Sequence, residues 1–250
     1  MAYVTTSCDK PGGRQPNSHV RRTAGAGRDR RFAMRFDGVI ERLQAALAQP
    51  LPGANAHALM APKPRREWPA DFNPARLRHA AGLLLVFPVA REAHVVLTIR
   101  ADTLGRHGGQ VSLPGGVAEP GETYAQAALR EAHEEIGLAP DAVRLLGALT
   151  PIDIPVSGFR LHPILAAADA LPGLTPSDGE VAQILEVGIA DLCDPSRQTS
   201  LTLSREGGDV VAPAFGIAGT RIWGATAMVL AEFLVLLGWA LERGDRKRVP

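Results

Sequence analysis

The stretch that decides the fold is GVAEPGETYAQAALREAHEEIGL, residues 116–138. A glycine loop leads here into a segment with helical periodicity. Glu131, Glu134 and Glu135 stand at i, i+3 and i+4, spacings that bring side chains together on one side of a helix. Like charges at these spacings destabilise a helix unless a positive charge lies among them. The stretch therefore predicts a helix that binds a hard divalent cation, Mg²⁺ or Mn²⁺.

The other side of the same helix is apolar. Its residues recur with a period near 3.6 and form a stripe for the core: Ala125, Ala128, Leu129, Ala132 and Ile136. An ordinary solvated acidic helix would explain the charges. It would not explain the loop of Pro114, Gly115 and Gly116 before the helix, or Gly137 at its end. We therefore expect one face of the helix to pack and the other to bind.

The fixed positions of this stretch form a longer motif: a glycine, five residues, a glutamate, seven residues, then Arg-Glu-apolar-any-Glu-Glu-any-Gly-apolar. The positions are filled by Gly116, Glu122, Arg130, Glu131, Ala132, Glu134, Glu135, Gly137 and Leu138. The motif resembles the Nudix box of hydrolases that cleave a nucleoside diphosphate linked to another group. The resemblance implies a Nudix pyrophosphohydrolase with an α/β/α sandwich fold, in which a mixed β-sheet lies between helices.

The resemblance also implies roles for the residues of the box. Glu131, Glu134, Glu135 and the carbonyl of Gly116 would hold Mg²⁺ or Mn²⁺ on the substrate diphosphate. Arg130 would orient these carboxylates by ion pairing. A water molecule would then attack one phosphorus in line.

The motif does not decide which carboxylate is the general base. Glu134, Glu135 and the downstream Glu180 all qualify. Glu180 is equally well explained as a charge at a strand edge. Three residues are therefore candidates for the one catalytic base.

A second pattern precedes the box. The chain matches it at Thr98, Arg100, Ala101, Gly109, Pro114, Gly115 and Gly116, and departs from it at Val96, Gly105 and Leu113. The pattern resembles the signature of coenzyme A pyrophosphatases within the Nudix superfamily, and similarity to that family covers roughly residues 80–240. It implies that coenzyme A or a derivative is hydrolysed to 4′-phosphopantetheine and adenosine 3′,5′-bisphosphate.

Three side chains of this upstream segment are candidates for binding substrate phosphate. Arg100 and Arg106 qualify because guanidinium groups fit phosphate oxygens. The pattern has an arginine where this chain has Gly105, and the neighbouring Arg106 could take its place. His107 could donate a hydrogen bond. Each has a plainer alternative, a surface arginine or a solvated loop histidine.

Two other functions are compatible with the same residues. One is a diphosphatase acting on ADP-ribose, NADH or another nucleoside diphosphate derivative. The other is a non-catalytic Nudix-like module that only binds a nucleotide. The intact set of carboxylates favours an enzyme, because a module that only binds has no need for every metal ligand.

The composition indicates an ordinary globular protein. Among 250 residues, 46% are hydrophobic and the net charge is +1, which gives no overall attraction to nucleic acid or to an anionic membrane. Cys8 and Cys193 fit no disulfide or zinc pattern, so we expect free thiols and a cytoplasmic location. The expected organisation is an Arg-rich disordered tail (1–33), a helix with a Pro-rich connector (34–75), the Nudix domain (76–243) and a basic tail (244–250).

The rest of the chain alternates between apolar runs and helical patterns, which favours the α/β class. Helices are expected at residues 36–48 and 224–243. Strands are expected at residues 80–89, 94–99, 111–113, 143–149, 160–166 and 178–187, with a small hairpin at 201–203 and 210–211. Residues 51–73 and 151–158 are expected to be irregular, and Trp68 is expected to anchor the first of these segments.

The last helix is nearly all apolar, so a transmembrane span has to be weighed. Glu232 lies in its middle and would cost roughly 2.5–3.5 kcal/mol at a bilayer centre. We therefore favour a buried core helix or a dimer interface. A homodimer is compatible with this helix, and no membrane or nucleic-acid partner is expected.

Overall fold

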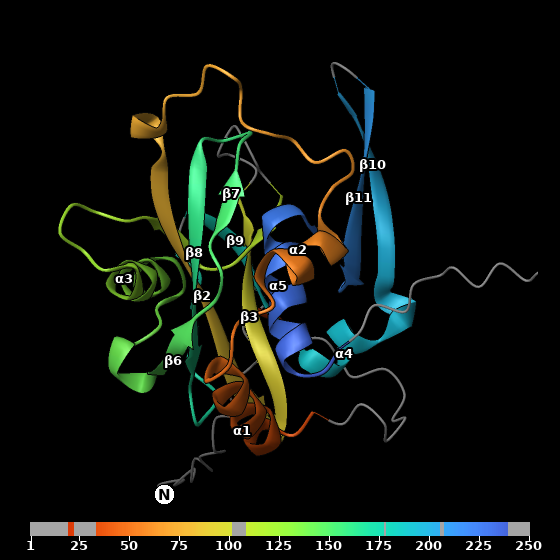
Figure 1. Ribbon diagram of the computed structural model, residues 1–250. Coiled ribbons are helices and arrows are strands. Elements are labelled where there is room, and N and C mark those ends of the chain that lie inside the picture. The colour runs from red at the N-terminus through yellow and green to blue at the C-terminus, as the bar shows by residue number, and fades with distance from the viewer. Residues whose placement is uncertain (1–19, 23–33, 102–108, 178, 206–207, 240–250) are drawn as a thin grey trace, which may run out of the picture.

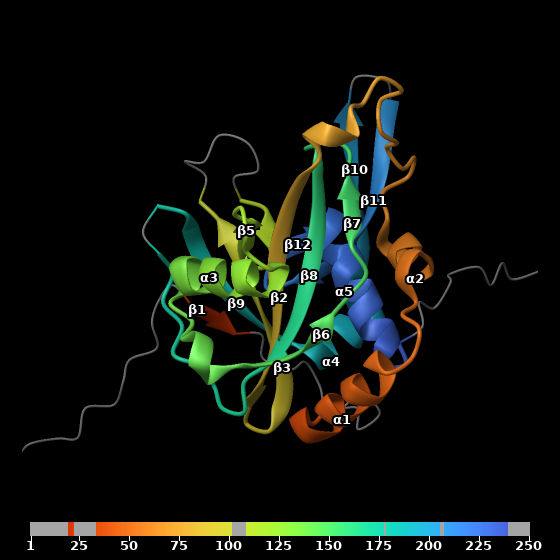
Figure 2. The same cartoon turned by 60° about the vertical axis from the view of Figure 1, so that its left-hand side comes forward.

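A mixed sheet between helices forms the centre of the molecule (Figure 1). The computed structural model describes residues 20–22, 34–101, 109–177, 179–205 and 208–239. The box helix α3 (Tyr124–Ile136) covers one face of the sheet, and α5 (Gly224–Leu236) lies on the other side (Figure 2). This arrangement confirms the α/β class and the layered order expected from the sequence.

The main sheet has the strand order β1-β9-β3-β2-β8-β6, and the short strands β4, β5 and β7 pair with β3, β2 and β8. The pairs β2–β8 and β1–β9 are parallel, and the others are antiparallel. The strands are β1 (Val20–Arg22), β2 (Arg78–Val89), β3 (Glu92–Arg100), β4 (Val111–Ser112), β5 (Gly115–Val117), β6 (Arg144–Ala148), β7 (Ile152–Ile154), β8 (Phe159–Ala167) and β9 (Val181–Gly188).

The central strands are buried on both faces. Along β2, Leu83 and Leu85 pack with α3, whereas Leu84 and Val86 pack in the cluster that includes α5. Strands buried on both faces read as continuous apolar runs rather than alternating ones. This explains why the predicted hairpin of residues 80–89 and 94–99 is confirmed as β2 and β3.

Helix α3 has well-defined ends. Thr123 and Gln126 form a capping box at its start, and Gly137 ends it with a φ of +66°, a conformation that favours glycine. Three alanines, Ala127, Ala128 and Ala132, make up most of its buried face, together with Ile136 and Glu135. The expected stripe is therefore rotated slightly, because Ala125 and Leu129 are only partly buried.

The N-terminal third contains structure that the sequence did not predict. Helix α1 (Phe36–Leu47) is confirmed, but the Pro-rich connector also contains α2 (Gly53–Met60), and η2 (Pro74–Arg76) follows. Trp68 stacks on Phe72 and donates to Asp153 over 3.4 Å, so it does contact the domain.

Residues 20–22 contradict the expectation of an unstructured tail, because they form β1 beside β9. An edge strand such as β9 offers unpaired backbone groups that a passing segment can satisfy. Arg22 also forms an ion pair with the buried Glu186. The remaining residues of both predicted tails lie outside the described residues.

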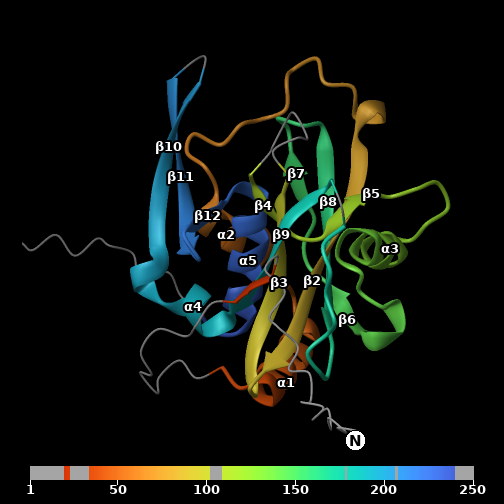
Figure 3. The same ribbon diagram turned by 180° about the vertical axis from the view of Figure 1, so that it is seen from behind.

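The C-terminal half contains more strands and helices than the sequence predicted. The small hairpin is a three-stranded sheet of β10 (Gln198–Arg205), β11 (Gly208–Ile217) and β12 (Thr220–Trp223), which lies beyond α5 (Figure 3). The expected irregular segment 151–158 contains β7. The helix α4 (Ile189–Cys193) and the turns η3 (Pro140–Ala142) and η4 (Pro195–Arg197) were not predicted.

Helix α5 is a core helix, and it ends before the predicted residue 243. Its acid Glu232 is fully buried and accepts hydrogen bonds from Gly53, His57 and Thr150. Burial raises the pKa of Glu232, but the bonds from His57 and Thr150 outweigh it and hold the pKa below its ordinary value. In the part of the chain that the structure describes, no helix is long and apolar enough to span a bilayer.

The ion pair between Arg22 and Glu186 generates a first prediction. Arg22→Ala leaves a buried carboxylate unpaired, so we expect the free energy of unfolding to fall by about 1–3 kcal/mol, moderated because Arg22 is half exposed. In the double variant with Glu186→Gln, much of this loss should be recovered. Urea unfolding of the four proteins measures the coupling, and equal effects of Arg22→Ala in both backgrounds would contradict it.

Candidate active site

The glycine loop lies on the sheet directly beside α3. Strand β5 pairs with residues 80–82 of β2, which brings Gly115 and Gly116 against the sheet. A side chain on Gly115 would overlap the backbone of Ala81 and Gly82, so glycine is required for this approach. A side chain on Gly116 would displace the carboxylate of Glu131. The loop and the acidic side of the helix are thereby held in contact.

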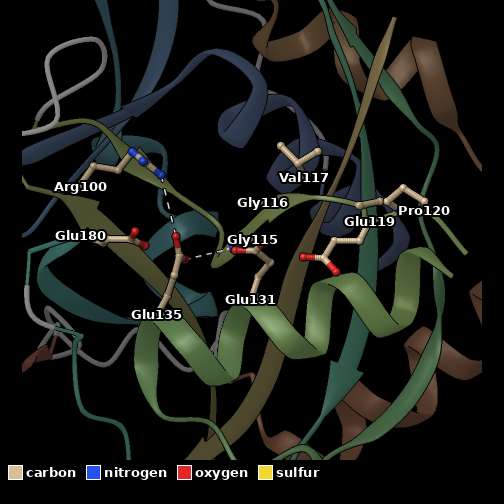
Figure 4. Close-up of a pocket in the computed structure, with 10 residues that line it drawn as sticks. Arg100, Gly115, Gly116, Val117, Glu119, Pro120, Glu131, Glu135 and Glu180 are labelled. Carbon is tan, nitrogen blue, oxygen red and sulfur yellow. Dashed lines mark hydrogen bonds and ion pairs between the residues drawn. The ribbon is translucent and has the colours of Figure 1, made fainter. Parts of the chain in front are cut away.

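A pocket of about 500 Å³ opens between this loop, α3 and the ends of two strands (Figure 4). Its lining residues are Arg100, Gly115, Gly116, Val117, Ala118, Glu119, Pro120, Glu131, Glu135 and Glu180. Carboxylates outnumber the single arginine in this lining. Such a concentration of acids attracts cations rather than the anionic diphosphate itself.

Glu135 is the most unusual acid of the pocket. It is only 4% exposed, accepts a hydrogen bond from the Gly115 amide at 3.1 Å, and lies 3.9 Å from the Arg100 guanidinium. Burial raises its pKa to about 7; the Gly115 amide and Arg100 oppose the shift, and the charges of Glu131 and Glu180 add to it. Glu135 therefore changes its protonation state near neutral pH.

Arg130 connects the loop with the acids of the helix. Its guanidinium donates to Glu122, Glu131 and Glu134 at 2.8–3.2 Å and to the carbonyl of Val117 at 3.1 Å. The hydrogen bond with Arg130 is also the main cause that lowers the pKa of Glu122. One cation thus neutralises acids from both parts of the motif.

The structure divides the predicted site residues into three groups. Arg100, Gly116, Glu131, Glu135 and Glu180 meet in the pocket. The second group does not line it: the side chain of Glu134 is 55% exposed and bonds to Arg130, since it points roughly 100° away from Glu135 around the helix axis. The third group, Arg106 and His107, lies outside the described residues.

Sequence reasoning missed four lining residues in the loop, Val117, Ala118, Glu119 and Pro120. All occupy the five variable positions between Gly116 and Glu122. A motif carries no information at such positions. The charge of Glu119 so close to the other acids was the one available signal.

Comparison with known proteins identifies the family of this chain. The family model of the NUDIX domain matches residues 77–200. An uncharacterized Nudix hydrolase, NudL, of Enterobacter sp. (strain 638) is 31% identical over 162 residues, which cover 64% of this chain and 84% of that protein. The NudL of Cronobacter sakazakii is 34% identical over 164 residues, covering 64% and 83%. Among solved structures, the M. smegmatis Nudix hydrolase RenU aligns with a TM-score of 0.47 and 21% identity, covering 72% of this chain and 93% of RenU.

The chain therefore belongs to the Nudix hydrolase family. It is accordingly an enzyme, a pyrophosphohydrolase. Nudix hydrolases generally use divalent metals such as Mg²⁺ or Mn²⁺, so the pocket can be tested for its fit to such an ion.

The donor set fits a hard divalent cation. Four acids and the Gly116 loop share one pocket, and the raised pKa of Glu135 indicates that positive charge there would be favourable. Among the described residues, no three His, Cys, Asp or Glu side chains form a closed metal site as they stand. A closed site is not required, because Mg²⁺ usually binds through one or two carboxylates, waters and substrate phosphates.

The burial of Glu135 predicts how metal-free stability depends on pH. Its folded-state pKa lies near 7, above the ordinary 4.5, so its favourable contribution is complete below pH 4.5 and is lost as pH rises through 7. Glu135→Gln cannot ionise and can still accept the Gly115 hydrogen bond. We expect this variant to be about 2–3 kcal/mol more stable than wild type at pH 8 without metal.

Unfolding by urea after removal of metal by a chelator measures this difference. The two proteins should differ least below pH 4.5, and added Mg²⁺ should stabilise wild type more than Glu135→Gln. A stability difference that is the same at pH 4.5 and pH 8 would show that Glu135 does not titrate as described.

Proposed function

We propose that this enzyme is a coenzyme A diphosphatase that uses Mg²⁺ or Mn²⁺ and yields 4′-phosphopantetheine and adenosine 3′,5′-bisphosphate. The observation that carries the proposal is the place of Arg100. This residue belongs to the pattern at residues 98–116 that resembles coenzyme A pyrophosphatases, and its side chain lines the pocket beside Glu135. A cytoplasmic location remains a prediction from the sequence.

The backbone around Arg100 supports this assignment. The Arg100 amide donates to Gln110, and the Gly109 amide donates to the Arg100 carbonyl, at 3.1 and 3.0 Å. The Ala101 amide donates to the carbonyl of Glu180 at 2.9 Å. These bonds hold a phosphate-binding candidate and a candidate base at the same edge of the pocket.

The chemistry requires neutralisation of the diphosphate charge. Bound Mg²⁺ or Mn²⁺ would supply Lewis acidity toward the diphosphate oxygens. Glu131, Glu134, Glu135 and the Gly116 carbonyl would hold the ion, as the family motif implies. Arg100, which lines the pocket beside Glu135, would bind phosphate oxygens, because a guanidinium can contact two such oxygens at once.

The hydrolysis adds one water across a phosphorus–oxygen bond. The water oxygen bonds to one phosphorus, the bridging oxygen leaves on the other phosphate, and a base accepts the proton. Glu135 is one candidate base, because it lines the pocket and burial raises its pKa in the metal-free protein. Glu180 lines the same pocket and is the second candidate.

A test of the substrate uses the purified full-length enzyme with Mg²⁺ and three separate substrates: coenzyme A, ADP-ribose and NADH. Mass spectrometry should detect 4′-phosphopantetheine and adenosine 3′,5′-bisphosphate formed faster than the products of the other two. Cleavage of ADP-ribose or NADH without cleavage of coenzyme A would overturn the substrate assignment. Absence of turnover with all three would favour a module that only binds, or a different diphosphate.

Arg100→Lys refines the same test. Lysine keeps the charge but loses the two-pronged hydrogen bonding of the guanidinium. We expect kcat/KM for coenzyme A to fall by about tenfold. Unchanged kcat/KM would remove Arg100 from the substrate contacts.

The role of Glu134 can be tested separately, because its exposed side chain leaves the core untouched. Glu134→Gln should lose nearly all turnover, by about 10²-fold or more, if Glu134 holds the cation. Glu119→Gln is the matched control: it removes a pocket charge that lies outside the family motif, and about fivefold or less is expected. Retained activity of Glu134→Gln at saturating Mg²⁺ would exclude Glu134 from the essential residues.

A further inference from the structure

A cluster of ring side chains lies at the start of α3, apart from the residues that line the pocket. It consists of Tyr124 at the first position of the helix, His79 on β2 and His162 on β8. None of the three belongs to the fixed positions of the family motif. The chemistry described above makes no use of them.

The contacts in this cluster are close and directional. The Tyr124 ring stacks on the His162 ring with centroids 3.5 Å apart and an angle of 11°. The Tyr124 hydroxyl lies 3.1 Å from His79 Nδ1, which lies 2.9 Å from His162 Nε2. Burial, His79 and Arg160 lower the pKa of His162 to about 4, so this imidazole is neutral and can share a hydrogen with its neighbour.

His79 also holds the loop that precedes the helix. Its backbone carbonyl accepts a hydrogen bond from the Ala118 amide at 3.0 Å. Ala118 follows the glycine loop directly, and Tyr124 follows the N-cap of the helix. One residue of the sheet therefore fixes both ends of the connection between loop and helix.

The packed face of α3 leaves the orientation of the helix open to the cluster of Tyr124, His79 and His162, which we call the clamp. Ala127, Ala128 and Ala132 are fully buried and present a nearly smooth surface to the sheet. Helix packing depends on side chains that fit into grooves, and alanines offer little resistance to a small rotation or slide. The larger side chains of the helix therefore contribute more to its orientation, and Tyr124 at its start and the buried Ile136 at its end are two of them.

Tyr124 lies on the same side of α3 as two of the acids. Glu131 and Glu135 follow Tyr124 by seven and eleven residues, so all three lie on nearly the same side of the helix. Gly116 leaves so little room at the Glu131 carboxylate that a methyl group would overlap it. A small rotation of α3 therefore changes the place of both carboxylates relative to the loop.

We propose that Tyr124, clamped by His79 and His162, is a positioning residue that sets the orientation of α3 and thereby the affinity of Glu131 and Glu135 for a divalent cation. This rests on the proposed use of Mg²⁺ or Mn²⁺, but not on the identity of the substrate. The clamp acts on the cation through the helix and contacts no reacting atom.

The test measures binding of Mn²⁺ alone to the metal-free full-length protein, by titration with electron paramagnetic resonance of the free ion. Tyr124→Leu removes both the stack and the hydroxyl, and we expect Mn²⁺ affinity to fall about tenfold or more. Tyr124→Phe keeps the ring and should lose only about two- to fivefold. The graded response separates positioning from a general loss of structure.

Gln126→Ala is the matched control. It removes the two hydrogen bonds that the Gln126 side chain accepts from Thr123 at the same end of α3, and Gln126 has no described contact with His79 or His162. We expect its Mn²⁺ affinity to remain within twofold of wild type. An equal loss in Gln126→Ala and Tyr124→Leu would show that only helix stability matters, and would overturn the proposal.

Wild-type affinity in folded Tyr124→Leu would also overturn the proposal, with folding checked by circular dichroism and urea unfolding. If that variant does not fold, unchanged affinity in Tyr124→Phe does so instead. Substrate is absent from the experiment, so a wrong assignment of coenzyme A leaves the result intact. Failure of the wild-type protein to bind Mn²⁺ would instead contradict the proposed metal site itself.

Discussion

The carboxylate of Glu135 lies on a helix face that otherwise packs against the sheet, and its burial constrains much of what surrounds it. One backbone amide and a guanidinium at 3.9 Å do not restore its ordinary pKa. The glycine loop approaches closely enough to provide that amide, and the end of β3 provides the guanidinium. Much of the local structure therefore serves to hold an acidic group in the pocket wall with little exposure to solvent.

Arg130 neutralises the acids on the solvent-exposed side of α3. It joins acids that are adjacent in the helix with Glu122, which lies before the helix, and with the loop carbonyl of Val117. Without a cation in the pocket, the acids would repel one another at helical spacing. The arginine thus stabilises the helix in a way that does not depend on whether a metal is bound.

The sequence was sufficient to predict those elements that are specified by residues close together in the chain. The box helix has its own caps and period, and the hairpin of β2 and β3 reads directly from two apolar runs. It was insufficient where stabilisation comes from distant partners. Helix α2 has a weakly patterned sequence and depends on Glu232, 179 residues beyond Gly53, and β1 depends on the edge of β9.

The same distinction applies to the site. The spacing of the acids correctly indicated that Glu131 and Glu135 approach one another, but it could not separate Glu134 from them, since that depends on the rotation of the helix against the sheet. The lining residues of the loop occupy variable positions, which a motif cannot predict. Position along the chain also gave no hint that His79, Tyr124 and His162 meet.

The buried carboxylate of Glu232 has a consequence for what counts as the folding unit. It joins α5 to the start of α2 and to Thr150, so segments from both ends of the chain meet at one charge. The family model covers residues 77–200 and includes neither helix. That segment alone would expose the apolar sheet face that α1 and α5 cover. The hydrophobic core of this protein therefore extends well beyond residues 77–200 that the family model matches.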